Sequence, residues 1–259
     1  MSTSSAGRRV PAAILAAIAA AWLVSLAAEA SGSAGRLHHD SLIEGGPPLW
    51  AALPAFLIAW QVMIGAMMLP SSLPMIRLFR AAATRQERPA ATLAAFLGGY
   101  LLVWTGFGAA AFLGDIAVHR TVHATPWLES HPWLISAGVL ALAGGFQFTD
   151  LKDRCLEQCR HPGMYLMRHY RRGVGEGYRL GRDHGMFCLG CCWALMLVMF
   201  AAGVANLVWM ALLGAVMFYE KAGRHGRRLT PVVGVALLVW AGLVLAHPAW
   251  LPGALAGLS

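Results

Sequence analysis

The chain has 259 residues, of which 58% are hydrophobic and 12% are charged, and its formal net charge is +8. A soluble domain usually carries about 25% charged residues, so this composition excludes an ordinary water-soluble fold. Several apolar runs of 17 or more residues carry no charge, which is the length a helix needs to cross a bilayer. The basic residues lie in short loops beside these runs, so membrane orientation rather than nucleic-acid binding explains the positive charge.

The apolar runs predict an all-α bundle of seven membrane helices, forming a single membrane domain over residues 1–259. A signal peptide is an alternative reading of the first run, with a small-residue cleavage pattern at Ala28-Glu29-Ala30-Ser31, but the run is longer than a usual signal core. The predicted spans are Val10–Ala28, Leu49–Leu69, Ala91–Leu113, Trp133–Thr149, Met186–Ala202, Ala205–Tyr219 and Thr230–His247.

The fifth and sixth spans come from a stretch of 34 uncharged residues, Met186–Tyr219. A single helix of that length would measure ~51 Å, so we expect a hairpin around Gly203-Val204-Ala205-Asn206. Seven spans with the N-terminus inside place 18 of the 20 Lys and Arg residues in the inner segments 1–9, 70–90, 150–185 and 220–229. This asymmetry predicts a cytoplasmic N-terminus. Six spans are the alternative, and they would move four of these charges outside.

All five cysteines lie within 38 residues near the predicted cytoplasmic ends of spans four and five. Residues four apart on a helix share one face, so Cys155 and Cys159 form one predicted pair, and Cys188 and Cys192 form another. Pro162 is expected to end the first cysteine helix. Because the cytoplasm keeps thiols reduced, a structural disulfide is not expected.

Four thiolates suit zinc, copper(I) or an iron–sulfur centre. Nearby positive charge lowers the pKa of a thiol, so the basic neighbours are expected to favour thiolate. Those neighbours are Lys152, Arg154, Arg160 and Arg182. The candidate metal ligands are Cys155, Cys159, Cys188, Cys191, Cys192, His161 and His184. Small buried hydrophobic residues are the alternative interpretation, above all for Cys191 and Cys192 within an apolar run.

Several stretches of the chain form a recognisable set of motifs. They are Gln147–Arg160, Gly181-x-x-His184-Gly185-x-x-Cys188-Leu189-Gly190-Cys191-Cys192-Trp193, Gly203-x-x-Asn206-Leu207-x-Trp209-Met210, Glu220-Lys221, and Trp60, Met67-Met68-x-Pro70-Ser71 and Pro74. These stretches resemble a bacterial membrane family, domain of unknown function 2182, described as predicted metal-binding integral membrane proteins. The resemblance covers roughly residues 50–222 and implies a multi-pass protein of the bacterial inner membrane. One departure is Asp150, where the family has proline before its first cysteine. Without that proline, span four is expected to run straight into the cysteine helix.

Weaker candidates lie elsewhere in the chain. The thioethers of Met63, Met67 and Met68 could bind copper(I), although methionine is a common core filler, and Gln61 is a polar group within a span. His119 and His123 are four residues apart and close to Asp115, so they could hold a metal near the outer surface. The basic loop 150–185 carries part of the cysteine cluster and is expected to contact anionic lipid headgroups, with a partner protein as the alternative.

The leading functional hypothesis is an integral membrane protein that binds copper or zinc through cytoplasmic cysteines, for transport, delivery or sensing. A partner membrane or metal-delivery protein would accompany that role. A membrane thiol oxidoreductase is the second hypothesis, and an enzymatic role is the less favoured one because the Cys-x-x-x-Cys spacing is unusual for redox cycling. A structural subunit of a larger complex is the third.

Overall fold

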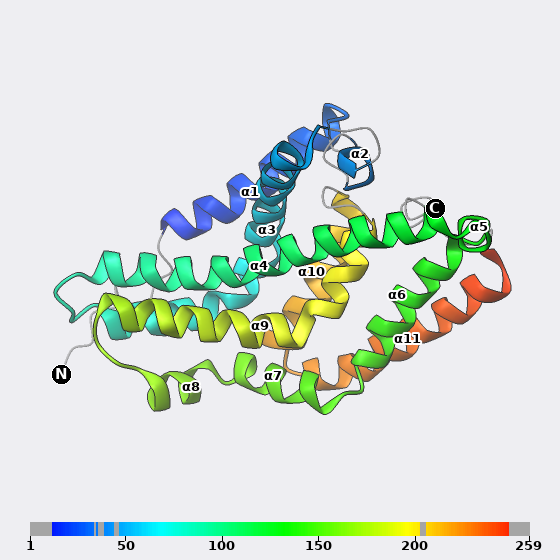
Figure 1. Ribbon diagram of the computed structural model, residues 1–259. Coiled ribbons are helices and arrows are strands. Elements are labelled where there is room, and N and C mark those ends of the chain that lie inside the picture. Colours follow the sequence, from blue (N-terminus) through cyan, green and yellow to red (C-terminus); the bar gives the residue numbers. More distant parts are fainter. Residues whose placement is uncertain (1–11, 34, 36–38, 44–46, 203–205, 249–259) are drawn as a thin grey trace.

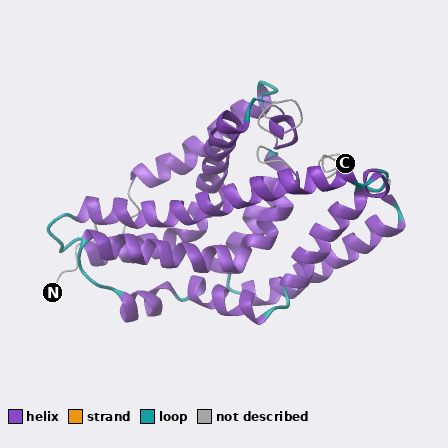
Figure 2. Cartoon of the chain, in the orientation of Figure 1, coloured by secondary structure: helices purple, strands orange, loops and turns teal. Residues whose placement is uncertain are grey.

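The computed structural model describes residues 12–33, 35, 39–43, 47–202 and 206–248, and every regular element within them is a helix (Figures 1 and 2). The all-α prediction is confirmed for this part of the chain. The helices are α1 (Ala12–Ala30), α2 (His39–Ile43), α3 (Leu49–Ala83), α4 (Pro89–Ala124), α5 (Pro126–Glu129), α6 (Trp133–Phe146), α7 (Asp150–Arg160), α8 (Pro162–His169), α9 (Val174–Ala202), α10 (Leu207–Ala222) and α11 (Gly226–Ala246).

Helix length gives fewer spans than the sequence predicted. Among the described residues, five helices are long and apolar enough to cross a membrane, namely α1, α3, α4, α9 and α11, which indicates a multi-pass membrane protein. A sixth span results if α6 and α7 are counted together as one broken span. Helix α10 has 16 residues, fewer than the ~20 that a span usually needs. The count of seven is therefore not confirmed, and the N-terminal segment 1–9 lies outside the described residues.

The structure corrects the expected junction between span four and the cysteine helix. Helix α6 ends at Phe146, and α7 begins at Asp150 after a bend of 64°, so one continuous helix was the wrong expectation. Asp150 stands where the family that the sequence resembles has proline, but Thr149 caps α7 by accepting a hydrogen bond from the Lys152 backbone N–H. Six of the eleven residues of α7 are charged, whereas α6 carries no charge, so α7 is poorly suited to contact lipid tails.

The uncharged stretch after Met186 divides into two helices, as the hairpin interpretation predicted. Helix α9 ends at Ala202, and α10 begins at Leu207, where the side chain of Asn206 accepts from the Trp209 backbone N–H. Residues 203–205 of the predicted turn lie outside the described residues. The cysteines of α9 and the charged end of α10 can therefore face each other across the hairpin.

Helices α4 and α9 lie side by side along much of their length (Figure 1). A stripe of glycines on α9 permits this contact: a Cβ atom on Gly177 would lie 2.7 Å from the Thr92 carbonyl oxygen, and one on Gly181 would overlap the carbonyl oxygen of Phe96. Small residues allow such backbone contact between membrane helices. The close approach fixes the α4 side chains against the cysteine-bearing face of α9.

Helix α3 carries three prolines, Pro54, Pro70 and Pro74, within its 35 residues. Proline cannot donate a backbone hydrogen bond, so the helix is locally weakened around Pro70 and Pro74. Ser71 lies in this region and its hydroxyl donates to the Met68 carbonyl oxygen at 2.9 Å. The weakened segment of α3 faces the middle of α9 and the C-terminal end of α10, which carry the candidate site.

Candidate metal centre

Three sulfur atoms converge on one buried ammonium group. The Nζ atom of Lys221 lies 3.1 Å from Cys188 Sγ, 3.8 Å from Cys192 Sγ and 4.0 Å from Met68 Sδ. All four residues are at most 5% exposed. We call Cys188, Cys192 and Met68 the sulfur cluster. Its members come from α3 and α9, and the lysine comes from α10.

Local helix geometry places the two thiols together. Cys188 and Cys192 are one helical turn apart on α9, and the Cys192 thiol donates to the Cys188 carbonyl oxygen at 2.8 Å. Cys192 Sγ also lies 3.9 Å from Met68 Sδ. Two sulfurs bound at ~2.3 Å to one metal ion are about 3.8–4.0 Å apart in tetrahedral or trigonal geometry. The spacing between Cys192 Sγ and Met68 Sδ is therefore compatible with two ligands of one metal ion.

Aromatic and hydroxyl groups close the site from α4 and α3. Tyr100 OH lies 3.3 Å from Cys188 Sγ, and the Ser72 hydroxyl donates to Tyr100 OH at 3.1 Å. Ser71 Oγ is 3.3 Å from the Lys221 ammonium. His184, one turn before Cys188, stacks on Tyr100 and is 4% exposed, and its Nε2 has no hydrogen-bond partner among the described residues. His184 is therefore a nearby nitrogen donor with spare bonding capacity.

A second thiol pair links α7 to α9. Cys159 Sγ lies 3.9 Å from Cys191 Sγ, so the predicted meeting of the two cysteine segments is present in the structure. Cys155 packs against Gly190, where an added Cβ atom would lie 2.5 Å from Cys155 Sγ. The two segments thus pack without room for a side chain at Gly190.

The expected activation of the α7 thiols by basic neighbours is wrong. Hydrogen bonds to Cys188 and Cys191, together with burial, raise the pKa of Cys159 well above its usual value. Burial, followed by the charge of Cys191, raises the pKa of Cys155. The basic side chains are turned elsewhere: Lys152 pairs with Glu220, Arg160 with backbone carbonyls of α10 and its C-cap, and Arg182 with Asp183. Sequence proximity did not identify Lys221 as the cation that reaches the thiols.

A buried ion pair lies beside the site. Lys152 Nζ donates to Glu220 Oε2 at 2.7 Å, and their side chains are 0% and 2% exposed. Arg160 donates to the backbone carbonyl oxygens of Glu220 and Gly223. The carboxylate next to Lys221 in the chain is therefore already engaged by another lysine, which leaves the Lys221 ammonium to the sulfurs and Ser71.

The remaining predicted ligands are not brought to one point. His161 is exposed at the end of α7 and lies 3.1 Å from Glu157 Oε1. In the described part of the chain, no three His, Cys, Asp or Glu side chains are arranged to hold a metal ion by themselves. A centre built on Cys155, Cys159, Cys188 and Cys192 alone is thus not assembled in this geometry. Met68, a thioether that the sequence favoured as a packing residue, instead belongs to the sulfur cluster.

The predicted outer histidines also point to different partners. His119 Nδ1 lies 3.5 Å from Asp115 Oδ1, whereas His123 Nδ1 lies 3.6 Å from Glu129 Oε1. Both histidines line a cavity of about 620 Å³. Gln61 donates to Thr105 and to the Leu101 carbonyl oxygen, which gives it a structural role between α3 and α4.

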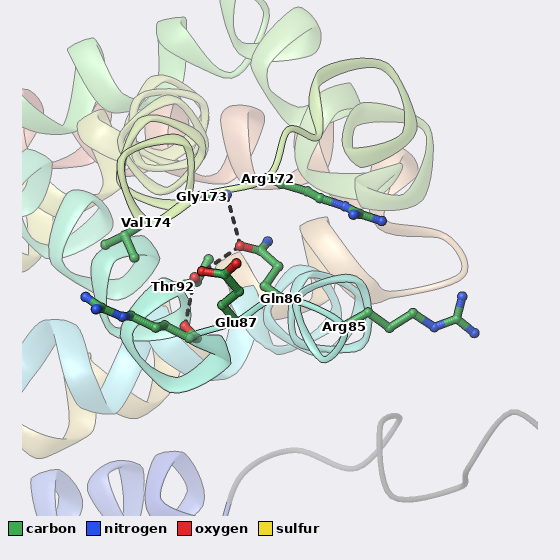
Figure 3. Close-up of a pocket in the computed structure, with 8 residues that line it drawn as sticks. Arg85, Gln86, Glu87, Thr92, Arg172, Gly173 and Val174 are labelled. Atoms are coloured by element: carbon green, nitrogen blue, oxygen red, sulfur yellow. Dashed lines mark hydrogen bonds between the residues drawn. The ribbon is translucent and has the colours of Figure 1, made fainter.

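The basic loop contributes to a separate cavity of about 450 Å³ (Figure 3). Gln86 forms its floor, accepting hydrogen bonds from the Gly173 N–H at 2.9 Å and from Thr92 at 3.3 Å. Arg85 and Arg172 line the rim and extend away from Gln86 (Figure 3). This cavity lies where α3 meets α4 and α8 meets α9, and its described lining residues include no member of the sulfur cluster.

Comparison with known proteins identifies the family. The family model PpoB2, described as a copper chaperone, matches residues 57–244, which is more than half of the chain and includes every residue of the sulfur cluster. No curated protein and no solved structure gives a significant match. The match supports a copper-related family, and the likeness to domain of unknown function 2182 stays a resemblance. The chain belongs to the PpoB2 copper chaperone family.

Proposed function

We propose that this protein is a membrane-embedded chaperone that binds copper(I) as cargo between Cys188, Cys192 and Met68. The observation that carries the proposal is the convergence of these three sulfur atoms within 4.0 Å of one point, the Lys221 Nζ atom. Thiolate and thioether ligands select copper(I), while harder cations prefer oxygen. The family description names the same metal.

We propose that the Cys159–Cys191 pair takes part in passing copper to a partner protein. Cys159 lies on the charged helix α7, and its sulfur is 3.9 Å from a cysteine of the membrane helix α9. Copper leaving the sulfur cluster would meet these thiols before it reached a partner. We therefore propose α7 and the adjoining basic loop as the surface that a metal-accepting protein approaches, with anionic lipid headgroups at the arginine-lined rim.

The distribution of Lys and Arg residues supports a particular orientation of the protein in the membrane. We propose seven spans with the N-terminus in the cytoplasm of a bacterial inner membrane, because 18 of the 20 Lys and Arg residues then lie inside. Helix α10 would cross with its 16 residues, since Lys221 at its inner end reaches back into the protein. The thiol oxidoreductase and structural-subunit hypotheses stay predictions.

A paired set of variants tests the copper site. The parent protein, Cys188→Ser/Cys192→Ser and Cys155→Ser would each be purified in detergent without oxygen, loaded with copper(I) and passed through a desalting column. We expect about one tightly held copper per chain in the parent and in Cys155→Ser, because Cys155 packs against Gly190 outside the sulfur cluster. The double variant is expected to hold none.

Mass spectrometry of the metal content gives the readout, and X-ray absorption at the copper edge reports whether sulfur atoms surround the ion. Equal copper in the parent and the double variant would contradict the proposed site. Loss of copper from Cys155→Ser as well would move the site to α7.

A further inference from the structure

We propose that Lys221 sets the valence of the bound metal, so that the sulfur cluster takes a monovalent ion in preference to zinc. This inference rests on the proposed copper function. It starts from the position of the ammonium group, which has sulfur atoms as three of its four neighbours and Ser71 as the fourth. A lysine that is 5% exposed must have its charge balanced nearby.

The charges around Lys221 can be counted group by group. Lys152 and Glu220 neutralise each other at 2.7 Å. The guanidinium of Arg160 is bound to backbone carbonyl oxygens at the end of α10 and in its C-cap, away from the sulfurs. His184 stacks between aromatic rings of α4. Cys159 and Cys191 form the neighbouring thiol pair, 3.9 Å apart, and are not among the proposed ligands. The charges among the proposed ligands and the ammonium that touches them are therefore the Lys221 charge and the two thiolates of Cys188 and Cys192, once a metal replaces their protons.

This count favours one charge state of the metal. Cys188 and Cys192 bind metal as thiolates and together contribute two negative charges. Lys221 supplies one positive charge, and the Met68 thioether supplies none. A monovalent ion such as copper(I) completes a neutral site, whereas a divalent ion leaves one positive charge uncompensated in the protein interior. An uncompensated buried charge is strongly unfavourable.

The Lys221 side chain is long and flexible enough to move aside when a metal binds. Its Nζ lies where the three sulfurs converge, so the ammonium must withdraw when a metal enters. A flexible four-carbon stem permits that movement while the charge stays near the thiolates, and Ser71 Oγ at 3.3 Å already offers a hydrogen-bond acceptor on the α3 side. Lys221 is therefore a specificity-determining residue that balances charge without ligating the metal.

The test compares copper(I) and zinc affinities in three proteins: the parent, Lys221→Gln and Lys221→Arg. Glutamine removes the charge without adding a sulfur ligand, and arginine keeps the charge. Each affinity would be measured by competition with a chromophoric chelator, copper(I) without oxygen and zinc separately. Thermal unfolding in detergent shows whether each variant is folded.

We expect Lys221→Gln to shift the ratio of affinities toward zinc by at least about tenfold, because two thiolates and one divalent ion then sum to zero. Lys221→Arg is expected to keep the parent ratio within about threefold, since its charge is retained. An equal change in both affinities, or no change in their ratio, in a folded Lys221→Gln protein would overturn the inference. Failure of the parent to bind copper(I) at all would instead overturn the proposed function.

Discussion

Replacing Gly181 with alanine is expected to destabilise the protein by about 3 kcal/mol or more. An added Cβ atom at this position would overlap the carbonyl oxygen, carbonyl carbon and Cα of Phe96, all of which belong to the backbone of α4. A side chain could rotate away, but a helix backbone cannot move without separating α4 from α9 along their length. The measurement is the unfolding midpoint in detergent, followed by tryptophan fluorescence or circular dichroism.

Gly175 provides the matched control on the same helix. A Cβ atom there would meet nothing within 4 Å, and alanine favours a helix by about 1 kcal/mol over glycine. We expect Gly175→Ala to unfold at the parent temperature or slightly above it. A stable Gly181→Ala protein would mean that the two helices are farther apart than described. Because the same contact holds Tyr100 3.3 Å from Cys188 Sγ, the destabilised variant should also lose copper.

Breaking the buried ion pair between Lys152 and Glu220 is expected to cause a second large loss of stability. Glu220→Gln leaves the Lys152 ammonium, whose side chain is 0% exposed, without its carboxylate 2.7 Å away. Removing one partner of a buried pair typically costs 3–5 kcal/mol, because the other charge is left uncompensated. We expect a loss of that size in the free energy of unfolding, and a similar loss for Lys152→Met.

The double variant separates the charge effect from packing. Lys152→Met/Glu220→Gln removes both charges, and neutral replacements of a buried pair are often tolerated. We expect it to recover more than half of the stability that either single variant loses, as measured by a double-mutant cycle. If the losses of the single variants simply add, the two side chains do not act as a pair.

The sequence was sufficient for the fold class and for much of the helix pattern. Apolar runs identify the membrane helices because lipid imposes a simple length rule, and the hairpin between Ala202 and Leu207 could be expected because a single helix would be too long. The bend before α7 was missed because the expectation relied on an absent proline. Thr149 starts a new helix as the N-cap of α7, so the break after Phe146 needs no proline.

The candidate site could be predicted only in part. The cysteines of α9 are recognisable from their spacing, since Cys188 and Cys192 must share a helix face. Met68 and Lys221 reach the same point only through the packing of α3, α9 and α10, and no local pattern encodes that meeting. The charge of Lys221 was counted in the sequence as an orientation signal, although its ammonium lies buried among sulfurs. Pairwise contacts between distant helices therefore decide which of several soft donors form the site.

The site residues are far apart in the sequence, and this separation links the stability of the protein to its supply of copper. Met68 and Lys221 are separated by 153 positions, and Met68 and Cys192 by 124. An unfolded chain keeps Cys188 and Cys192 four residues apart, but it must close the 124-residue loop before it can add Met68 as the third ligand, so copper would bind the folded form more tightly. At a free copper concentration a hundredfold above the dissociation constant, binding would add up to about 2.7 kcal/mol to the free energy of unfolding. In a cell starved of copper, the same molecules would unfold more often and meet proteases sooner, so the abundance of this protein would follow the availability of its cargo without any change in its synthesis.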